Sequence, residues 1–164
     1  VIHQHRAHER ILYEEFLQHI TVNQAVSQQL LFPVTIAITK DEFFHFNIVK
    51  EVLENTGFAF SNVNEENLEV SGIPVAIEDS KAIIIIQDLL SNMNNNTEGN
   101  ELHANLVAKS MAKSIAIKSG KSLTSNEQED IVNRLFACKE PTVSPINKAI
   151  FITYSTSDFD KKLL

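Results

Sequence analysis

The sequence predicts a mixed α+β fold, because helical and strand patterns alternate along its 164 residues. The helical segments repeat apolar residues three and four positions apart, whereas the strand segments are short runs of β-branched and aromatic residues. A helix–strand–strand–helix block lies between about residues 40 and 100. We therefore expect two lobes, with residues 39–102 inserted into a lobe formed by residues 1–38 and 103–164.

The first two elements are expected to be a helix and an apolar strand. Residues 5–19 place apolar side chains on one helical face, while most of the charged residues lie off that face. Residues 29–38 are β-rich and almost wholly apolar, which indicates a strand buried on both faces or lying at an interface. Pro33 cannot donate a hydrogen bond to a sheet, so it should lie at an edge or a bulge.

The next helix carries its own start and stop signals. Thr39 and Glu42 have the spacing of a capping box, so the helix should begin there and continue to about Asn55. Gly57 is expected directly after its end, because glycine readily adopts the left-handed conformation that terminates helices.

The remaining elements follow from short local patterns. We expect strands at 58–61, 67–71 and 73–77, with a turn at Gly72. A helix is expected from Ser80 to Met93, although its four consecutive isoleucines also suit a strand. The sequence further predicts a loop over 92–100, helices over 102–119 and 124–135, a strand over 149–154, and a last turn over 158–164 capped by Ser157.

The composition limits the function classes. The net charge is -7 and the isoelectric point about 5.3, which argues against strong autonomous DNA binding. A local basic stretch over 109–121 can still touch phosphates. The single Cys138 excludes an internal disulfide and a cysteine-rich zinc site, and no apolar run is long enough to span a membrane. Because the chain opens on Val1 in a strand-like segment, we expect it to come from a longer protein.

The beginning of the chain resembles a motif of the MutL family. Residues 3–14 read HQHRAHERILYE, and MutL proteins with endonuclease activity share the motif DQHAxxExxxxE. The matching positions are Gln4, His5, Glu9 and Glu14. His3 replaces the aspartate of the motif, and Arg6 replaces its alanine.

Two further motifs of the MutL family have degenerate counterparts. Residues 112–118 are similar to the motif AC[HKR]xAI[KR], with Lys113 in place of the cysteine. Residues 144–150 occupy the place of the motif CPHGRPT, with Ser144 and Ile146 in place of the cysteine and histidine. The stretch around Cys138 lacks the Ala-Ile-Lys that should follow the cysteine, so we do not assign it to the motif.

The resemblance implies the C-terminal dimerisation fold of MutL, with a regulatory lobe inserted into the dimerisation lobe. It also implies a homodimer that couples upstream ATPase domains, which use ATP and magnesium and are absent from this chain. The implied partners are the sliding clamp, the mismatch recognition protein MutS and other repair proteins, with weak or indirect DNA contact and no membrane. The implied location is the cytoplasm, at the nucleoid.

The metal chemistry of the family is expected to be lost. A catalytic zinc or manganese ion needs several nitrogen, oxygen or thiolate ligands that converge on one point. Lys113 and Ile146 offer no such ligand, so we expect no catalytic residue, no metal and no cofactor in this chain. The alternative is a divergent DNA-nicking endonuclease with a metal bound by His3, His5, His8 and Glu9. These four residues can equally serve only to hold the first helix.

The segment 28–33 reads QQLLFP and resembles the clamp-docking motif Qxx[L/I]xP of MutL proteins. In this interpretation Gln28 forms hydrogen bonds in a pocket of the clamp, while Leu31 and Phe32 fill an apolar groove and Pro33 completes the motif. The alternative is that the apolar residues are simply strand core.

The apolar strands at 30–38 and 150–154 are candidates for a dimer interface, because pairing two copies would cover them. A third possibility is a small binding domain unrelated to repair, whose motif matches are accidental.

Overall fold

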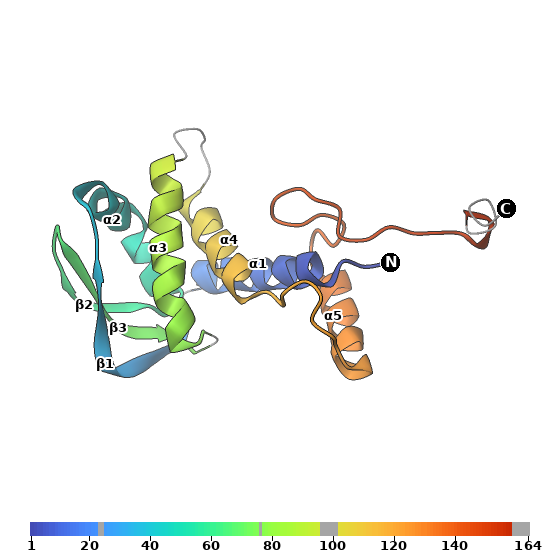
Figure 1. The fold of residues 1–164 in the computed structure, drawn as a ribbon, viewed down its shortest axis with the longest axis horizontal. Helices are drawn as coiled ribbons and strands as arrows, with labels where there is room; N and C mark the ends of the chain where they lie inside the picture. Colours follow the sequence, from blue (N-terminus) through green and yellow to red (C-terminus); the bar gives the residue numbers. More distant parts are fainter. Residues whose placement is uncertain (23–24, 76, 96–101, 159–164) are drawn as a thin grey trace. The chain divides into compact units, whose positions relative to one another are not determined.

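The computed structural model describes residues 1–22, 25–75, 77–95 and 102–158 (Figure 1). Its elements are, in chain order, α1 (Gln4–Val22), β1 (Ser27–Ala37), α2 (Lys40–Asn55), β2 (Ala59–Val63), β3 (Asn67–Pro74), α3 (Asp79–Asn95), α4 (His103–Ile115) and α5 (Ser125–Ala137). The predicted α+β class is therefore confirmed. None of the helices in the described ranges is long and apolar enough to cross a membrane.

The chain divides into two compact units. Unit 1 consists of Val1–Leu12 and Ala116–Leu164, and unit 2 consists of Tyr13–Ile115. The predicted lobes had other boundaries, because they grouped β1 and α4 with the chain ends. In the structure, both elements belong to the unit that contains residues 39–102. Which unit dimerises stays a prediction.

Unit 2 contains an antiparallel sheet with the strand order β1-β3-β2. β1 is an edge strand, and its register with β3 shifts between Gln29 and Val34. Pro33 therefore lies in a bulge of an edge strand, as its missing N–H group required. Of the two alternatives predicted for this strand, burial on both faces is wrong, because Ile36 is the only buried residue of β1. The alternative that the strand lies at an interface stays a prediction. Because β1 is at the edge of the described sheet, the backbone groups on its outer side have no strand partner.

β3 is one continuous strand, so the predicted turn at Gly72 is wrong. Gly72 pairs with Gln29 of β1 and with Ala59 of β2. It lies between two neighbouring strands, and its lack of a side chain serves close packing rather than a reversal of the chain.

The predicted signals of α2 are confirmed. The Thr39 side chain accepts a hydrogen bond from the backbone N–H group of Glu42, and the Glu42 carboxylate accepts one from the backbone of Thr39. Gly57 follows the C-cap with a φ of 100°, in the left-handed region. Phe46 of α2 packs edge-to-face on Phe60 of β2, with 4.8 Å between ring centroids, so α2 covers a face of the sheet.

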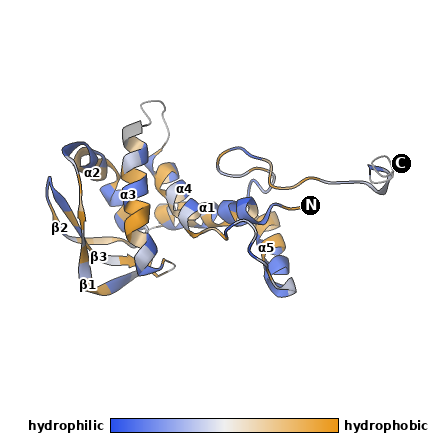
Figure 2. Cartoon of the chain, viewed as in Figure 1, coloured by the Kyte–Doolittle hydropathy of each residue, from blue (hydrophilic) through white to orange (hydrophobic). Residues whose placement is uncertain are grey.

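Helices α2, α3 and α4 contact one another in unit 2 (Figure 1). The four consecutive isoleucines lie within α3, which confirms the helical alternative, and Figure 2 shows this hydrophobic middle of the helix. The loop expected over 92–100 begins too early, because α3 continues to Asn95; its remaining residues, 96–100, lie outside the described part of the chain. α4 ends at Ile115, before the predicted end at Ser119.

Unit 1 has its own apolar core, which α5 helps to form. The predicted capping box of Thr124 and Glu127 is present at the start of this helix. The buried core residues are Ala7, Ile11, Ile131, Leu135 and Ile150. The first turns of α1 are thereby fixed against α5 and the C-terminal segment.

The strand predicted over 149–154 is wrong. Among the described residues, the segment forms two single antiparallel bridges, Ile2 with Phe151 and Val143 with Ala149, rather than a continuous ladder. The predicted cap of the last turn is also wrong. The Asp158 carboxylate accepts hydrogen bonds from the backbone and side chain of Ser155, not Ser157. Residues 159–164 lie outside the described part of the chain.

Candidate functional site

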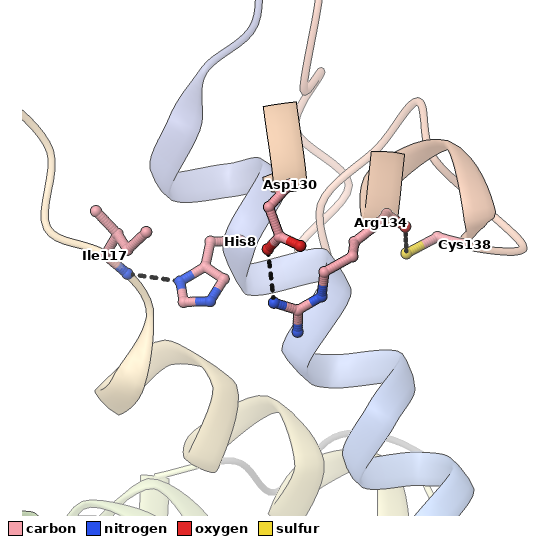
Figure 3. A network of polar contacts seen from close by, with 5 residues as sticks. All are labelled: His8, Ile117, Asp130, Arg134 and Cys138. Carbon is pink, nitrogen blue, oxygen red and sulfur yellow. Dashed lines mark hydrogen bonds and ion pairs between the residues drawn. The ribbon is translucent and has the colours of Figure 1, made fainter. Parts of the chain in front are cut away.

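Two histidines of α1 form hydrogen bonds with the backbone of one residue, Ile117, in the segment between α4 and α5. His5 Nδ1 lies 2.8 Å from the carbonyl oxygen of Ile117, and the N–H group of Ile117 donates to His8 Nδ1 at 3.0 Å. Figure 3 shows the His8 ring directed at this backbone. The geometry requires a proton on His5 Nδ1 and none on His8 Nδ1. Both rings therefore have a defined structural task.

The other two candidate ligands differ in their surroundings. His3 is exposed, and its Nδ1 accepts a long hydrogen bond of 3.5 Å from the Arg6 backbone. Glu9 is buried, with 4% of its surface exposed. Within the described ranges, no three His, Cys, Asp or Glu side chains are placed to hold a metal ion. The structure thus does not gather His3, His5, His8 and Glu9 into a ligand set.

The counterparts of the distal metal motifs do not supply the missing ligands. Ser144 is buried, and its hydroxyl accepts a hydrogen bond from the Lys148 backbone at 3.2 Å. Ile146 carries an exposed hydrocarbon side chain, and Lys113 is exposed at the end of α4. A hydroxyl, a hydrocarbon and an ammonium group are unsuited to hold zinc or manganese. The donor set of these positions does not fit the metal that the resemblance implies.

A buried arginine ties α1 to the C-terminal segment, and sequence reasoning missed it. The Arg10 side chain is 5% exposed, and its Nε–H group donates to the Val143 carbonyl at 2.7 Å. Its guanidinium also lies 3.4 Å from the Glu140 carboxylate. The expectation that charged residues of α1 lie off the buried face is wrong for Glu9 and for Arg10, which are both buried. Its location next to the motif position Glu9 was the only signal in the sequence.

A depression of about 300 Å³ lies between α1 and α5 in unit 1. It is lined by His8, Ile117, Asn126, Glu127, Asp130, Ile131 and Arg134. Asp130 and Arg134 form an ion pair of 3.3 Å, and the Cys138 thiol donates to the Arg134 carbonyl (Figure 3). The lining has two carboxylates, Glu127 and Asp130, against one guanidinium, Arg134, and the excess negative charge opposes the approach of a phosphate group. The depression is therefore poorly suited to hold a DNA backbone.

The clamp-docking segment is exposed on β1. Gln28 is paired with Ile73 of β3, and its side chain is exposed. Leu31 is 86% and Phe32 78% exposed, although both are large and apolar. The alternative that these two residues are strand core is wrong, since they lie in the bulge and point to solvent. Leu31 and Phe32 are adjacent, and exposed apolar side chains that lie together are more typical of an interaction site than single scattered ones.

Comparison with known proteins identifies the family. The family described as "MutL C terminal dimerisation domain" matches residues 1–123. The chain is 48% identical over 163 residues to "DNA mismatch repair protein MutL" of Christiangramia forsetii, covering 99% of this chain and 26% of the relative. The protein of the same name from Flavobacterium psychrophilum is also 48% identical, with 99% and 27% covered, and that from Parabacteroides distasonis is 31% identical, with 99% and 26% covered.

The chain thus spans about a quarter of the length of these relatives. The possibility that the motif matches are accidental is excluded, because the similarity extends over nearly the whole chain. The chain belongs to the MutL C-terminal dimerisation domain family.

Proposed function

We propose that this chain is a non-catalytic homodimerisation module of a mismatch repair protein, and that it also carries the docking segment for the sliding clamp. The observation that carries the first part is the chemistry of the former metal positions. Ser144 is already hydrogen-bonded, Ile146 and Lys113 offer no ligand, and the imidazoles of α1 are engaged with Ile117.

A combined metal and nicking assay tests the absence of catalysis. The full-length protein is incubated with zinc or manganese, its metal content is measured after gel filtration, and nicking of supercoiled plasmid is followed. We expect no stoichiometric metal in this domain and no nicking above the level of the Glu9→Ala variant. Bound metal together with nicking that Glu9→Ala abolishes would instead establish the divergent endonuclease built on His3, His5, His8 and Glu9.

We assign the dimer contact to the C-terminal segment of unit 1 rather than to β1. Ile146, Ile152 and Tyr154 expose apolar surface there, and the Val1–His3 segment lies beside them through its bridge to Phe151. A second copy that pairs about a two-fold axis would cover both. β1 is left free to dock another protein.

Sedimentation equilibrium separates the two surfaces. Ile152→Lys should weaken the dimer at least about tenfold, because it brings a charge into an apolar contact. Leu31→Lys, at an equally apolar but separate surface, should leave the dimer intact. The reverse outcome would place β1 in the dimer interface.

The proposed docking segment comprises Gln28, Leu31, Phe32 and Pro33. Its apolar side chains are already exposed, so a groove on the clamp can accept Leu31 and Phe32 without unfolding the sheet. Titration of the full-length protein with the clamp should show a loss of at least about tenfold for Leu31→Ala and a smaller loss for Gln28→Ala. Wild-type affinity in the Leu31→Ala variant would refute the docking.

The same resemblance supports a role in the whole protein. In this proposal two upstream ATPase domains are held together by the dimer, and MutS and other repair proteins are recruited to it. DNA is touched weakly, through exposed lysines such as Lys118 and Lys121. Crosslinking of these lysines to DNA, compared with their alanine variants, would test that contact.

A further inference from the structure

We infer that Gly72 is a positioning residue for the docking segment, which it keeps in a preformed bulge. This inference rests on the proposed clamp docking of β1. It concerns how the segment Leu30–Pro33 is presented, and not only which side chains the clamp contacts.

The bulge Leu30–Pro33, which contains the apolar part of the docking segment, is fixed at both flanks to the same strand. On the N-terminal flank, Gln29 pairs with Gly72; on the C-terminal flank, Val34 pairs with Val70. The four residues Leu30–Pro33 of β1 therefore lie opposite the single residue Ser71 of β3. The excess chain has to project away from the ladder, and this displays Leu31 and Phe32.

The pairing of β3 with its other neighbour changes at the same place. Ala59 of β2 pairs with Gly72, whereas the next residue, Phe60, pairs with Val70. Ser71 is thus unmatched on both sides of β3. The bulge in β1 is part of a local rearrangement of all three strands, centred on Gly72 and Ser71.

Gly72 permits this arrangement because it has no Cβ atom. A Cβ at this position would lie 2.7 Å from Ser27 Oγ and 3.0 Å from Ala59 Cβ. It would also lie 3.4 Å from the carbonyl oxygen of Gln28. The space above Gly72 is therefore filled by the N-terminal end of β1. A Cβ here would force the Ser27 hydroxyl aside and crowd Ala59, while the Gln28 carbonyl oxygen already lies at contact distance. A side chain at position 72 therefore pushes against the first residues of β1, where the docking segment starts.

A preformed bulge lowers the cost of docking. A segment that is free to move has to be ordered when it binds, and this ordering reduces affinity. Here the backbone is held at both flanks while the apolar tips are exposed. The clamp groove then meets Leu31 and Phe32 in one arrangement rather than many.

Clamp titrations with matched variants test this role in the full-length protein. Gly72→Ala is expected to weaken clamp binding by about tenfold, although residue 72 is not part of the motif. Combining it with Ser27→Ala, which removes the nearest obstructing atom, should restore most of the affinity. Ser27→Ala alone serves as the control and should bind as the wild type does. Dimerisation should be unchanged in all three proteins.

The outcomes separate this inference from the function on which it rests. Wild-type affinity in Gly72→Ala, together with loss of binding in Leu31→Ala, would overturn the role of Gly72 and leave the docking intact. Wild-type affinity in Leu31→Ala would overturn both. Should Gly72→Ala fail to fold, Ser27→Val fills the same space from the exposed strand. It is expected to show the same loss, and wild-type binding in that variant would overturn the inference.

Discussion

Arg10 and Val143 connect the first helix to the C-terminal segment through a hydrogen bond of 2.7 Å, made by a guanidinium group that is almost wholly buried. A buried charge is costly unless it is hydrogen-bonded, and a carbonyl that loses its donor in the interior is costly too. This pair is therefore expected to be important for the stability of unit 1.

The Arg10→Met variant should lower the free energy of unfolding by about 2 kcal/mol, since the methionine fills part of the space but leaves the Val143 carbonyl without this donor. Urea denaturation at fixed protein concentration measures the change. The comparison is Glu140→Gln, whose side chain is 66% exposed and should cost less than about 1 kcal/mol. Equal losses in both variants would show that the ion pair, rather than the buried hydrogen bond, is decisive.

His8→Ala should destabilise the chain by about 1 kcal/mol, because the N–H group of Ile117 loses its acceptor. His3→Ala is the matched control at an exposed histidine and should change stability by less than about 0.5 kcal/mol. Thermal unfolding without added metal distinguishes the two. If both variants are less stable than the wild type only when zinc is present, the histidines act as metal ligands and not as hydrogen-bond partners of the backbone.

The capping box of α5 predicts a defined pH dependence. Hydrogen bonds from the backbone and side chain of Thr124 lower the pKa of Glu127 below its usual value. The stabilisation that the ionised Glu127 carboxylate provides is therefore complete above the usual glutamate pKa. It is lost as the pH falls through the lowered pKa. Thr124→Ala should cost about 1 kcal/mol at neutral pH and progressively less in this acidic range. Unfolding curves of both proteins at several pH values provide the measurement, and a constant difference would contradict the mechanism.

Truncation to alanine should change the free energy of unfolding by very different amounts at two positions of β1. Leu31→Ala is expected to change the free energy of unfolding by less than about 0.5 kcal/mol, because the side chain is exposed. Ile36→Ala should cost about 2–5 kcal/mol, because this side chain is buried and its removal leaves a cavity. Denaturation midpoints of the two variants decide the matter. A large loss for Leu31→Ala would mean that the bulge packs against the chain.

Local signals in the sequence were sufficient for much of the fold. Helix ends were identified from signals that act within one turn of the chain. These are the capping boxes of Thr39 with Glu42 and of Thr124 with Glu127, and the glycine Gly57 after α2. Pro33 was correctly placed at an edge and a bulge, because its missing donor excludes it from a ladder.

Features that depend on distant residues could not be predicted in this way. Gly72 resembles a turn residue until Ser27 and Ala59 are placed beside it. Arg10 reads as a surface charge until the Val143 carbonyl is brought against it. The apolar run of β1 cannot reveal from its composition whether helices or solvent face it. For the candidate site, the sequence pointed to His5 and His8. It did not show that both rings form hydrogen bonds with the backbone of Ile117.

The bridge between Ile2 and Phe151 joins the two ends of the chain within unit 1. On the ribosome, the continuous stretch Tyr13–Ile115 can fold as soon as it emerges, whereas residues 1–12 have to wait until their partners beyond residue 116 have been made. Unit 1 is therefore completed only after the whole of unit 2 has been synthesised. A ribosome stalled before residue 116 would expose the apolar face of Ala7 and Ile11 to chaperones.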